Sequence, residues 1–519
     1  MAAPFTFLEL LNPMPRRFRV LNAGVMFALC LALAACASSL PVTSPQAHAD
    51  RITLFPLDAY DQNVDHWIDP AGSGYDMPFL SAQAQHEHLE ALYARYFGTA
   101  AEDPSPWNPA FIATRLYGQN GSDIADLQRR RIDRYDNDGK SATQIGYGQD
   151  FRPHTKQWID AIEHNMNVAQ FTQAPHYVAT ARAIATGNLL VRELPTADPS
   201  FYSYELAGEG YPFDNLQVSA IHPGTPLYVL GHTMDGAWIY VQTPDVQGWV
   251  QASEVGMIDD AFANIWRRQA HASWGAVVAA SAPARDETGT FRFEAPAGTL
   301  LPLAAIALNA RPGMRAVLVP VRDIDGRATI RRAWLADSQI APMPLAATPR
   351  HLAMLMKALI GRPYGWGNTG FYNDCSSELQ SIFAAFGVWL PRHSSTQMSA
   401  GQFTDLSDAK TAARLDYLMD HGEPMHTLVY IGGHVMLYLG TTERDGHKVP
   451  LVYQDIWGLR PADNSRRSVI GSSVIFPLSI SIPEDASLQS LAGTPIFQIS
   501  ILGLPTGMTP PNSQENPAS

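Results

Sequence analysis

The chain has 519 residues, of which 46% are hydrophobic, and its formal net charge at pH 7 is −13. A chain of this length is expected to hold several domains, because a domain commonly has about 100–200 residues, and its apolar content suffices for packed cores. The negative charge argues against nucleic acid as a partner and gives no reason to expect binding to an anionic membrane surface.

At the N-terminus, three arginines precede a mostly apolar stretch, residues 20–35, which ends in small residues before Cys36. A basic segment followed by an apolar one and small residues is typical of a secretory signal, so residues 1–35 are predicted to be a signal peptide. An uncleaved membrane anchor is the alternative, but the apolar stretch is short for a full span. Residues 36–50 are small, polar and proline-containing, which predicts a flexible tether.

The end of the predicted signal, LAAC, resembles the lipobox of bacterial lipoproteins. The resemblance implies that Cys36 is lipidated and becomes the first residue of the mature protein. The absence of an acidic residue directly after Cys36 resembles outer-membrane sorting in Gram-negative bacteria. We therefore expect an exported lipoprotein, held by its lipid at the outer membrane and facing the periplasm.

The sequence contains three cysteines, Cys30, Cys36 and Cys375. If the first is removed with the signal and the second carries lipid, Cys375 is the one thiol left in the mature protein. An exported chain with a single unpaired thiol has no disulfide framework, and that thiol is a candidate for reactivity.

Residues 51–175 have a mainly helical pattern and are predicted to form a helical domain. SAQAQHEHLEALYARYFG places apolar residues at helical spacing and ends in glycine, and IADLQRRRIDRY has a similar pattern. YVATARAIATGNLL, which follows, is a further candidate helix. The two histidines of HEH, residues 86–88, point to different helix faces, and neither a metal site nor a cofactor is expected in the chain.

Two β-rich blocks come next, residues 176–258 and 259–346. Short β-type runs alternate there with turn residues, and Asp-Gly pairs at 235–236 and 325–326 are typical of hairpin turns. The first block, with its GWV near the end, resembles a bacterial SH3-like barrel. The second resembles a more divergent barrel of the same kind.

A final α+β domain is predicted for residues 347–502, and the tail 503–519, rich in Pro, Asn and Ser, is predicted to be disordered. A glycine- and aromatic-rich loop leads to Cys375, and the apolar residues after it recur at helical spacing. Cys375 is therefore expected in the first turn of a helix, with Asp374 as its N-cap. A helix N-terminus favours a thiolate, so Cys375 is a candidate nucleophile; a buried structural cysteine is the alternative.

A nucleophilic thiol needs a base within reach, and His434 is the candidate. It precedes the β-type run VMLYLG and follows two glycines, which leave space around it. A base on a strand that faces the start of a helix is a sound arrangement for the pair.

YGWG, DCSS, LPRHSS and GGHVMLYLG together resemble the NlpC/p60 family of cell-wall cysteine peptidases, which have a papain-like core. The blocks upstream resemble the multidomain lipoprotein branch of that family. The resemblance implies that Cys375 is the nucleophile and that His434 is the general base and then the acid.

Gln454 stands where the family commonly has a histidine that orients the imidazole. Glutamine can accept the imidazole N–H but brings no charge. Its neighbour Asp455 should face the other way, because side chains alternate along a strand.

The resemblance also implies a substrate groove. The backbone N–H of Cys375 is the expected oxyanion donor at the helix start. The side chains that match groove positions of the family are Tyr364, Trp366, Asp374, Ser376, Arg392 and Ser394.

In this branch of the family the substrate is a peptidoglycan stem peptide, cut between D-glutamate and the diamino acid, which is L-lysine or meso-diaminopimelate. A free N-terminal L-alanine is often required, and its amine is held by an acidic residue of the first SH3-like block. Glu209 and Asp214 are the two candidates here, and the sequence does not choose between them.

Two other functions remain open. The protein could be a wall-binding scaffold whose papain-like domain is inert, an alternative that the neutral Gln454 keeps alive. The same fold could also carry out amidase or acyl-transfer chemistry on another substrate. The expected partners of the peptidase and of the scaffold are peptidoglycan stem peptides or muropeptides, and a membrane is expected through the lipid.

Overall fold

The computed structural model describes residues 51–503 except 174, 207–208, 305–310 and 445. The predicted signal, the tether, the lipid site at Cys36 and nearly all of the predicted tail lie outside the described residues. Within the described part of the chain, no helix combines the length and the apolarity needed to cross a membrane.

The last domain is built on a seven-stranded sheet with the order β1-β20-β19-β18-β17-β21-β16. All neighbouring pairs are antiparallel except β1 and β20, which are parallel. The first strand of this sheet therefore comes from the N-terminal region. The strands are β1 (Ile52–Leu54), β16 (Gln402–Asp405), β17 (Thr427–Tyr430), β18 (Val435–Arg444), β19 (His447–Leu459), β20 (Arg467–Pro477) and β21 (Gln498–Ile501).

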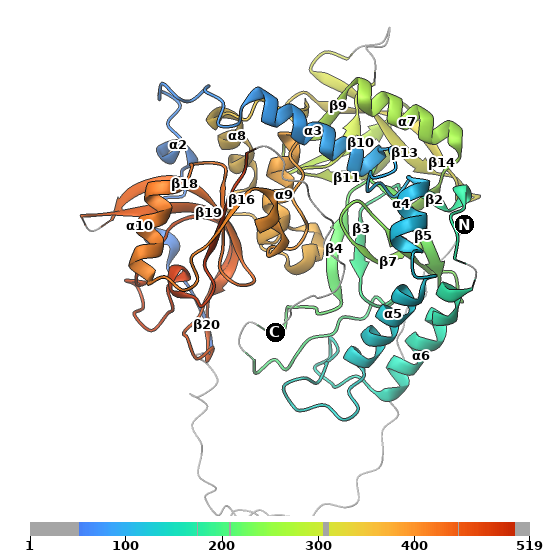
Figure 1. The fold of residues 1–519 in the computed structure, drawn as a ribbon, viewed down its shortest axis with the longest axis horizontal. Coiled ribbons are helices and arrows are strands. Elements are labelled where there is room, and N and C mark those ends of the chain that lie inside the picture. The colour runs from blue at the N-terminus through green and yellow to red at the C-terminus, as the bar shows by residue number, and fades with distance from the viewer. Residues whose placement is uncertain (1–50, 174, 207–208, 305–310, 445, 504–519) are drawn as a thin grey trace, which may run out of the picture. The chain divides into compact units, whose positions relative to one another are not determined.

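Helices cover both faces of this sheet (Figure 1). Helix α9 (Cys375–Ala385) buries Leu379 and Phe383 against the face that carries Leu437 and Tyr453. Helix α10 (Thr411–His421) packs on the opposite face, and α8 (Pro349–Leu359) contacts α9. The alternation of apolar side chains along each strand explains why both faces are covered.

The first barrel is a single sheet with the order β4-β3-β7-β6-β5-β2-β8. Gly236, in the predicted Asp-Gly turn between β5 and β6, has a φ of 71°, a conformation that glycine adopts without strain. The strands are β2 (Arg182–Ala185), β3 (Leu189–Arg192), β4 (Gln217–Ile221), β5 (Pro226–His232), β6 (Trp238–Gln242), β7 (Gln247–Gln251) and β8 (Val255–Met257).

The second barrel consists of two small sheets, with the orders β11-β10-β14-β13 and β12-β9-β15. Its core is aliphatic and alanine-rich, apart from Phe293. The strands are β9 (Trp274–Val277), β10 (Ser281–Asp286), β11 (Phe291–Pro296), β12 (Leu300–Pro302), β13 (Met314–Arg322), β14 (Ala328–Ala336) and β15 (Ile340–Pro342).

The helices of the N-terminal region pack on other parts of the chain. Leu92 and Phe97 of α3 join the core around α9, whereas α5 and α6 pack on the first barrel around Trp249 (Figure 1). The α-helices outside the last domain are α2 (Val64–Trp67), α3 (Ala82–Phe97), α4 (Pro109–Phe111), α5 (Ser122–Tyr135), α6 (Lys156–Met166) and α7 (Asp260–Ala272), and Ile112–Leu116 is a π-helix. Short 3₁₀ turns lie at Leu57–Ala59, Val168–Thr172, Ala179–Ala181, Ala252–Glu254, Trp366–Phe371 (η7), Thr396–Ala400 and Leu491–Gly493.

The helix predicted for YVATARAIATGNLL is wrong. After one 3₁₀ turn, this segment forms β2 and β3 of the first barrel. Every residue of β2 is buried, and the strand pairs with β5 on one side and β8 on the other. Burial inside a barrel outweighs the helix propensity of its alanines.

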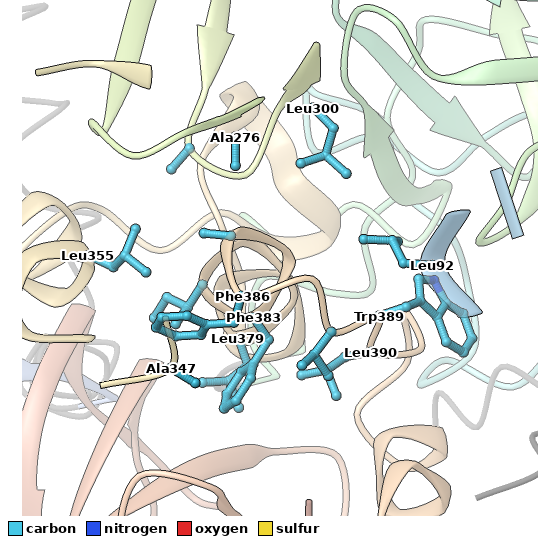
Figure 2. Packing of buried hydrophobic residues seen from close by; sticks show 14 of the residues in the cluster. Leu92, Ala276, Leu300, Ala347, Leu355, Leu379, Phe383, Phe386, Trp389 and Leu390 are labelled. Atoms are coloured by element: carbon cyan, nitrogen blue, oxygen red, sulfur yellow. The ribbon is translucent and has the colours of Figure 1, made fainter. Parts of the chain in front are cut away.

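The largest core surrounds α9, and several domains contribute to it. Figure 2 shows Leu379, Phe383 and Phe386 at its centre, with Ala276 and Leu300 of the second barrel on one side. Leu92, Leu355 and Trp389 are among the other labelled side chains around them. The helix that begins with Cys375 is thus held by apolar contacts from three parts of the chain.

Candidate active site

Cys375 is the first residue of α9, as predicted, and the turn before it is a capping box. The Asp374 carboxylate accepts from the Ser377 N–H at 3.0 Å, and the Ser377 hydroxyl accepts from the Asp374 N–H at 2.8 Å. These reciprocal bonds fix the first turn of the helix. The thiol is only 5% exposed, and it receives a backbone hydrogen bond from Val435, the residue after His434.

The expectation that the helix start favours a thiolate at Cys375 is wrong. Burial raises the pKa of the Cys375 thiol to about 12, and the neighbouring Asp374 carboxylate raises it further. The Val435 hydrogen bond and Arg392 act in the opposite direction but are weaker. At neutral pH the group is a thiol, so it needs a base to become a nucleophile.

His434 stands at the end of a tight turn, directly before β18. The two glycines before it have φ angles of 78° and 86°, in the left-handed region that glycine tolerates. The imidazole Nε2 lies 2.7 Å from Oε1 of Gln454 on β19. Because an amide oxygen can only accept, Nε2 carries the ring proton and Nδ1 is left as the basic nitrogen. Burial lowers the pKa of His434 to about 4, so the ring is neutral at pH 7.

Asp455 lies beside Gln454 but belongs to a second carboxyl cluster. Its two oxygens are buried without a hydrogen-bond partner among the described residues. Glu378 on α9 accepts from the hydroxyls of Tyr453 and Ser473, the latter at 2.6 Å. Burial, followed by the nearby Glu378, raises the pKa of Asp455 well above its usual range, and burial also raises the pKa of Glu378.

Arg392 is the centre of a buried polar network next to the nucleophile. It is 4% exposed, and its two terminal nitrogens contact the Asp374 carboxylate at 2.7 and 3.1 Å. It also donates to Ser376 Oγ at 2.8 Å and to Asn368 Oδ1 at 2.9 Å. The bidentate pair counters the burial of Asp374 and holds the pKa of that carboxyl below its usual range. Three of the predicted groove residues therefore bind one another and brace the nucleophile turn.

The first barrel contributes directly to this network. Arg392 Nε donates to Ser219 Oγ of β4 at 2.8 Å, and the Ala220 N–H donates to Asn368 at 3.3 Å. Gln217 donates to the carbonyl of Gly367 in η7 at 2.8 Å. A Cβ on Gly367 would lie 2.6 Å from the Gln217 carbonyl oxygen, so this close approach requires glycine. Sequence reasoning missed these barrel residues because no local motif marks them.

Aromatic rings line the region beside the nucleophile turn. Trp366 lies 5.3 Å from Phe213 of the first barrel, and Phe213 lies 5.3 Å from Trp457 of β19. Tyr364 is 6.2 Å from Trp457, and Cys375 and Asp374 help to raise its pKa, after burial. The predicted groove residues Tyr364 and Trp366 thus share a wall with two rings that sequence reasoning missed. Regular alternation along β19 would place Trp457 on the face opposite Gln454, and the register irregularity between Ile456 and Gly458 breaks that alternation.

The remaining predicted residues have other partners. Asp214 is buried, and its carboxylate is bonded by Arg192 at 2.5 Å and by the N–H groups of Ser200 and Leu216 at 2.9 and 3.0 Å. This carboxylate therefore holds the barrel loop together. Glu209 accepts from Asn464, in the β19–β20 turn, at 2.8 Å. Ser394 is half-buried, two residues beyond Arg392.

Three family models match successive parts of the chain. Residues 199–251 match the SH3 domain of SH3b1 type, and residues 259–305 match the SH3 domain of SH3b2 type. Residues 361–460, which contain Cys375, His434 and Gln454, match the NlpC/P60 family. The two predicted SH3-like domains are thereby confirmed.

Curated relatives match over a short segment. The chain is 38% identical over 82 residues to a gamma-D-glutamyl-L-lysine dipeptidyl-peptidase of Bacillus subtilis, and 31% identical over 98 residues to one of Bacillus cereus. These matches cover 15% and 18% of this chain, and 28% and 29% of the relatives. The chain thus spans less than a third of the curated relatives that it matches.

A solved structure matches over most of the chain. It is an NlpC/P60 endopeptidase from Photobacterium damselae subsp. piscicida, 26% identical, with a TM-score of 0.72. The likeness covers 88% of this chain and 100% of that one. With the nucleophile turn, the histidine and both barrels in place, the chain carries a domain that matches the NlpC/P60 family, and two SH3b-type domains precede it.

Proposed function

We propose that this protein is a cysteine peptidase that hydrolyses peptidoglycan stem peptides between D-glutamate and the diamino acid. The observation that carries the proposal is the His434–Gln454 hydrogen bond of 2.7 Å beside the capped start of α9, where Cys375 lies. The curated relatives are named for a gamma-D-glutamyl-L-lysine bond, which supports this choice of bond.

Both groups are neutral before the reaction, so the thiol proton is transferred as sulfur attacks and not beforehand. Because burial holds Cys375 as a thiol and His434 as a neutral imidazole, Nδ1 accepts the thiol proton as sulfur attacks the peptide carbonyl. The backbone N–H of Cys375, at the helix start, is the proposed donor to the oxyanion. His434 then gives its proton to the leaving amine of the diamino acid. Water, deprotonated by the same nitrogen, hydrolyses the thioester and regenerates the thiol.

Gln454 orients the imidazole without charge. It fixes the tautomer by accepting the Nε2 proton, but it stabilises the transient imidazolium less than a carboxylate would. A neutral orienting group is consistent with an active peptidase, and it is also the feature that favours the rival function, an inert wall-binding scaffold.

The direct test is digestion of purified stem peptides by the full protein, with products identified by mass. Peptides with a free and with a blocked L-alanine amine are compared, and Cys375→Ala is the matched inactive variant. We expect cleavage between D-glutamate and the diamino acid, abolished by the substitution. Binding without cleavage by the wild type would establish the scaffold, and a transferred acyl group in the products would establish acyl-transfer chemistry.

We also propose that the protein is exported and lipidated at Cys36, from the LAAC motif and the apolar stretch before it. The measurement is incorporation of labelled palmitate into wild type and into Cys36→Ala during growth. Label in the wild type alone supports the proposal, whereas an unlabelled wild type contradicts it.

A further inference from the structure

Three exposed aromatic side chains lie together on two neighbouring loops. Phe151, Tyr204 and Tyr211 are 52%, 63% and 49% exposed. Phe151 lies 5.8 Å from Tyr204 and 6.0 Å from Tyr211, between ring centroids, and Tyr211 rests 5.3 Å from the buried ring of Phe201. We call Phe151, Tyr204 and Tyr211 the aromatic platform. A cluster of exposed rings usually marks a binding surface, because soluble proteins rarely leave a contiguous apolar patch in contact with water.

The backbone holds the platform in place. Phe151 sits in a tight turn with a φ of 61°, a strained conformation for a residue with a side chain. The turn is closed by bonds from Phe151 N to Gly148 O at 3.0 Å and from Gly148 N to Arg152 O at 2.9 Å. Tyr147 and Phe201 exchange backbone bonds of 2.7 and 2.9 Å, which join the two loops. Strain that presents a ring to solvent suggests a function for that ring.

The loop between β3 and β4 carries two rings of the platform and one ring of the aromatic wall of the active site. Tyr211 is two residues from Phe213, which contacts both Trp366 and Trp457. A small pocket lies between the same loops and Trp366, and both aromatic rings and polar side chains line it. Its lining residues are Arg134, Tyr135, Gln144, Gly146, Ser200, Tyr202, Asn215, Gln217 and Trp366.

We propose that the aromatic platform and this pocket bind the amino-sugar rings to which a peptidoglycan stem peptide is attached. A pyranose ring presents C–H groups on one face, which pack on an aromatic ring, and hydroxyl and acetamido groups at its edge, which need polar partners. Two platform rings carry hydroxyls, and amide and hydroxyl groups line the pocket. This combination fits a saccharide better than an apolar peptide. The choice of ligand rests on the proposed function.

The acidic residues expected to hold a free L-alanine amine support the same conclusion. Asp214 is bonded inside the barrel, and Glu209 is bonded to Asn464. An L-alanine joined to the sugar has no free amine and needs no such carboxylate. On this proposal, the preferred substrate is a stem peptide that still carries its sugars.

The test compares kcat/KM on a disaccharide-tetrapeptide with kcat/KM on the same tetrapeptide without sugars. We combine Phe151→Ala, Tyr204→Ala and Tyr211→Ala, and expect a loss of about tenfold on the sugar-bearing substrate, which corresponds to about 1.4 kcal/mol and lies within the range of aromatic contacts. The loss on the sugar-free peptide should stay below about twofold. Tyr204→Phe with Tyr211→Phe keeps the rings and should retain most of the preference.

Control variants are Phe291→Ala and Phe403→Ala, which remove rings of similar exposure, 48% and 50%, in the second barrel and on β16. Unchanged kinetics of the triple variant would overturn the proposal. An equal loss on both substrates would do the same, since it would indicate contact with the peptide or a structural role.

A binding measurement separates this proposal from the proposed function. If the wild type cleaves neither substrate, the peptidase is wrong, and calorimetric titration of Cys375→Ala with each substrate decides the platform alone. Tighter binding of the sugar-bearing peptide, lost when the three rings are replaced, would still support it. Equal affinity for both would overturn it.

Discussion

The two SH3b-type domains contact the catalytic domain in different ways. The first reaches the turn before Cys375 with polar groups: Ser219 accepts from Arg392, and Gln217 donates to Gly367. The second packs on α9 beyond its first turn with apolar and small residues, among them Ala276 and Leu300 (Figure 2). One kind of fold thus orients a charged network in the first domain and supports a helix in the second.

This difference shows where each domain should affect activity. A hydrogen bond to a buried guanidinium is directional, so its loss alters the position of the nucleophile turn. An apolar contact has no preferred direction, so its loss lowers stability without redirecting a catalytic group. Substitutions in the first domain should therefore change rate constants, and those in the second should change the free energy of unfolding.

The largest effect is expected where the first domain meets the network, at Arg392. Arg392→Ala leaves the buried Asp374 carboxylate without its partner, which should lower the free energy of unfolding by about 3–5 kcal/mol and abolish cleavage. Denaturant unfolding and peptide digestion measure the two effects. Arg392→Lys keeps the charge but not the planar guanidinium, so its stability and its cleavage rate should lie between those of the wild type and of Arg392→Ala. An Arg392→Ala protein with wild-type stability and rate would show that the network is dispensable.

The contact of the second domain is best broken at Gly298, whose φ is 79°. A Cβ there would lie 2.7 Å from the Ser381 Cα on α9. Gly298→Ala should lower the free energy of unfolding by about 2–4 kcal/mol, from backbone strain and overpacking. The matched control is Gly289→Ala, at a φ of 83° with open space around the added methyl. This variant should lower the free energy of unfolding through backbone strain alone.

Kinetics of the folded Gly298→Ala protein then test the comparison. At a temperature where the variant is fully folded, kcat and KM should match those of the wild type. A fall in kcat under those conditions would mean that the second domain also positions catalytic groups.

A smaller effect is expected for Ser219→Ala, which removes one acceptor from Arg392 while leaving its pair with Asp374. Losing that bond should cost about 1 kcal/mol, seen as a fall of about fivefold in kcat with little change in KM. Ser281→Ala, at the start of β10 in the second domain, is the matched control and should keep its kcat. If both serine variants behave alike, the two domains do not differ as described.

The nucleophile turn was largely predictable and its partners were not. Asp374 before Cys375 is a local capping signal, and alternation along β19 correctly separated Gln454 from Asp455. Ser219 lies 173 residues from Arg392 in another domain, and only the packing of β4 on η7 brings them together. The protonation state of Cys375 could not be predicted from the sequence either, because burial sets the pKa of the thiol and burial is a property of the folded chain.

The smallest effect at neutral pH is the effect of pH itself on kcat/KM, which depends on the base, His434. Among the described residues, neither SH3b-type domain makes a hydrogen bond to His434. His434 must be neutral to accept the thiol proton, and burial lowers its pKa to about 4, below the usual value near 6.5. The acid limb of kcat/KM should therefore lie near pH 4, and the rate should change little between pH 7 and about 5.5. The unfolded chain binds this proton below about pH 6.5 and the folded chain only near pH 4, so His434 makes stability fall as pH drops through that window.

Gln454→Glu sharpens this prediction, because a carboxylate at the same position favours the charged imidazolium. It should move the acid limb upward by at least about one pH unit, whereas Gln454→Ala removes the bond and should lower kcat without raising the limb. A pH–rate profile of the two variants decides the matter. A limb near pH 6.5 in the wild type would show that His434 is solvated in solution, and that the base is no more buried than an ordinary surface histidine.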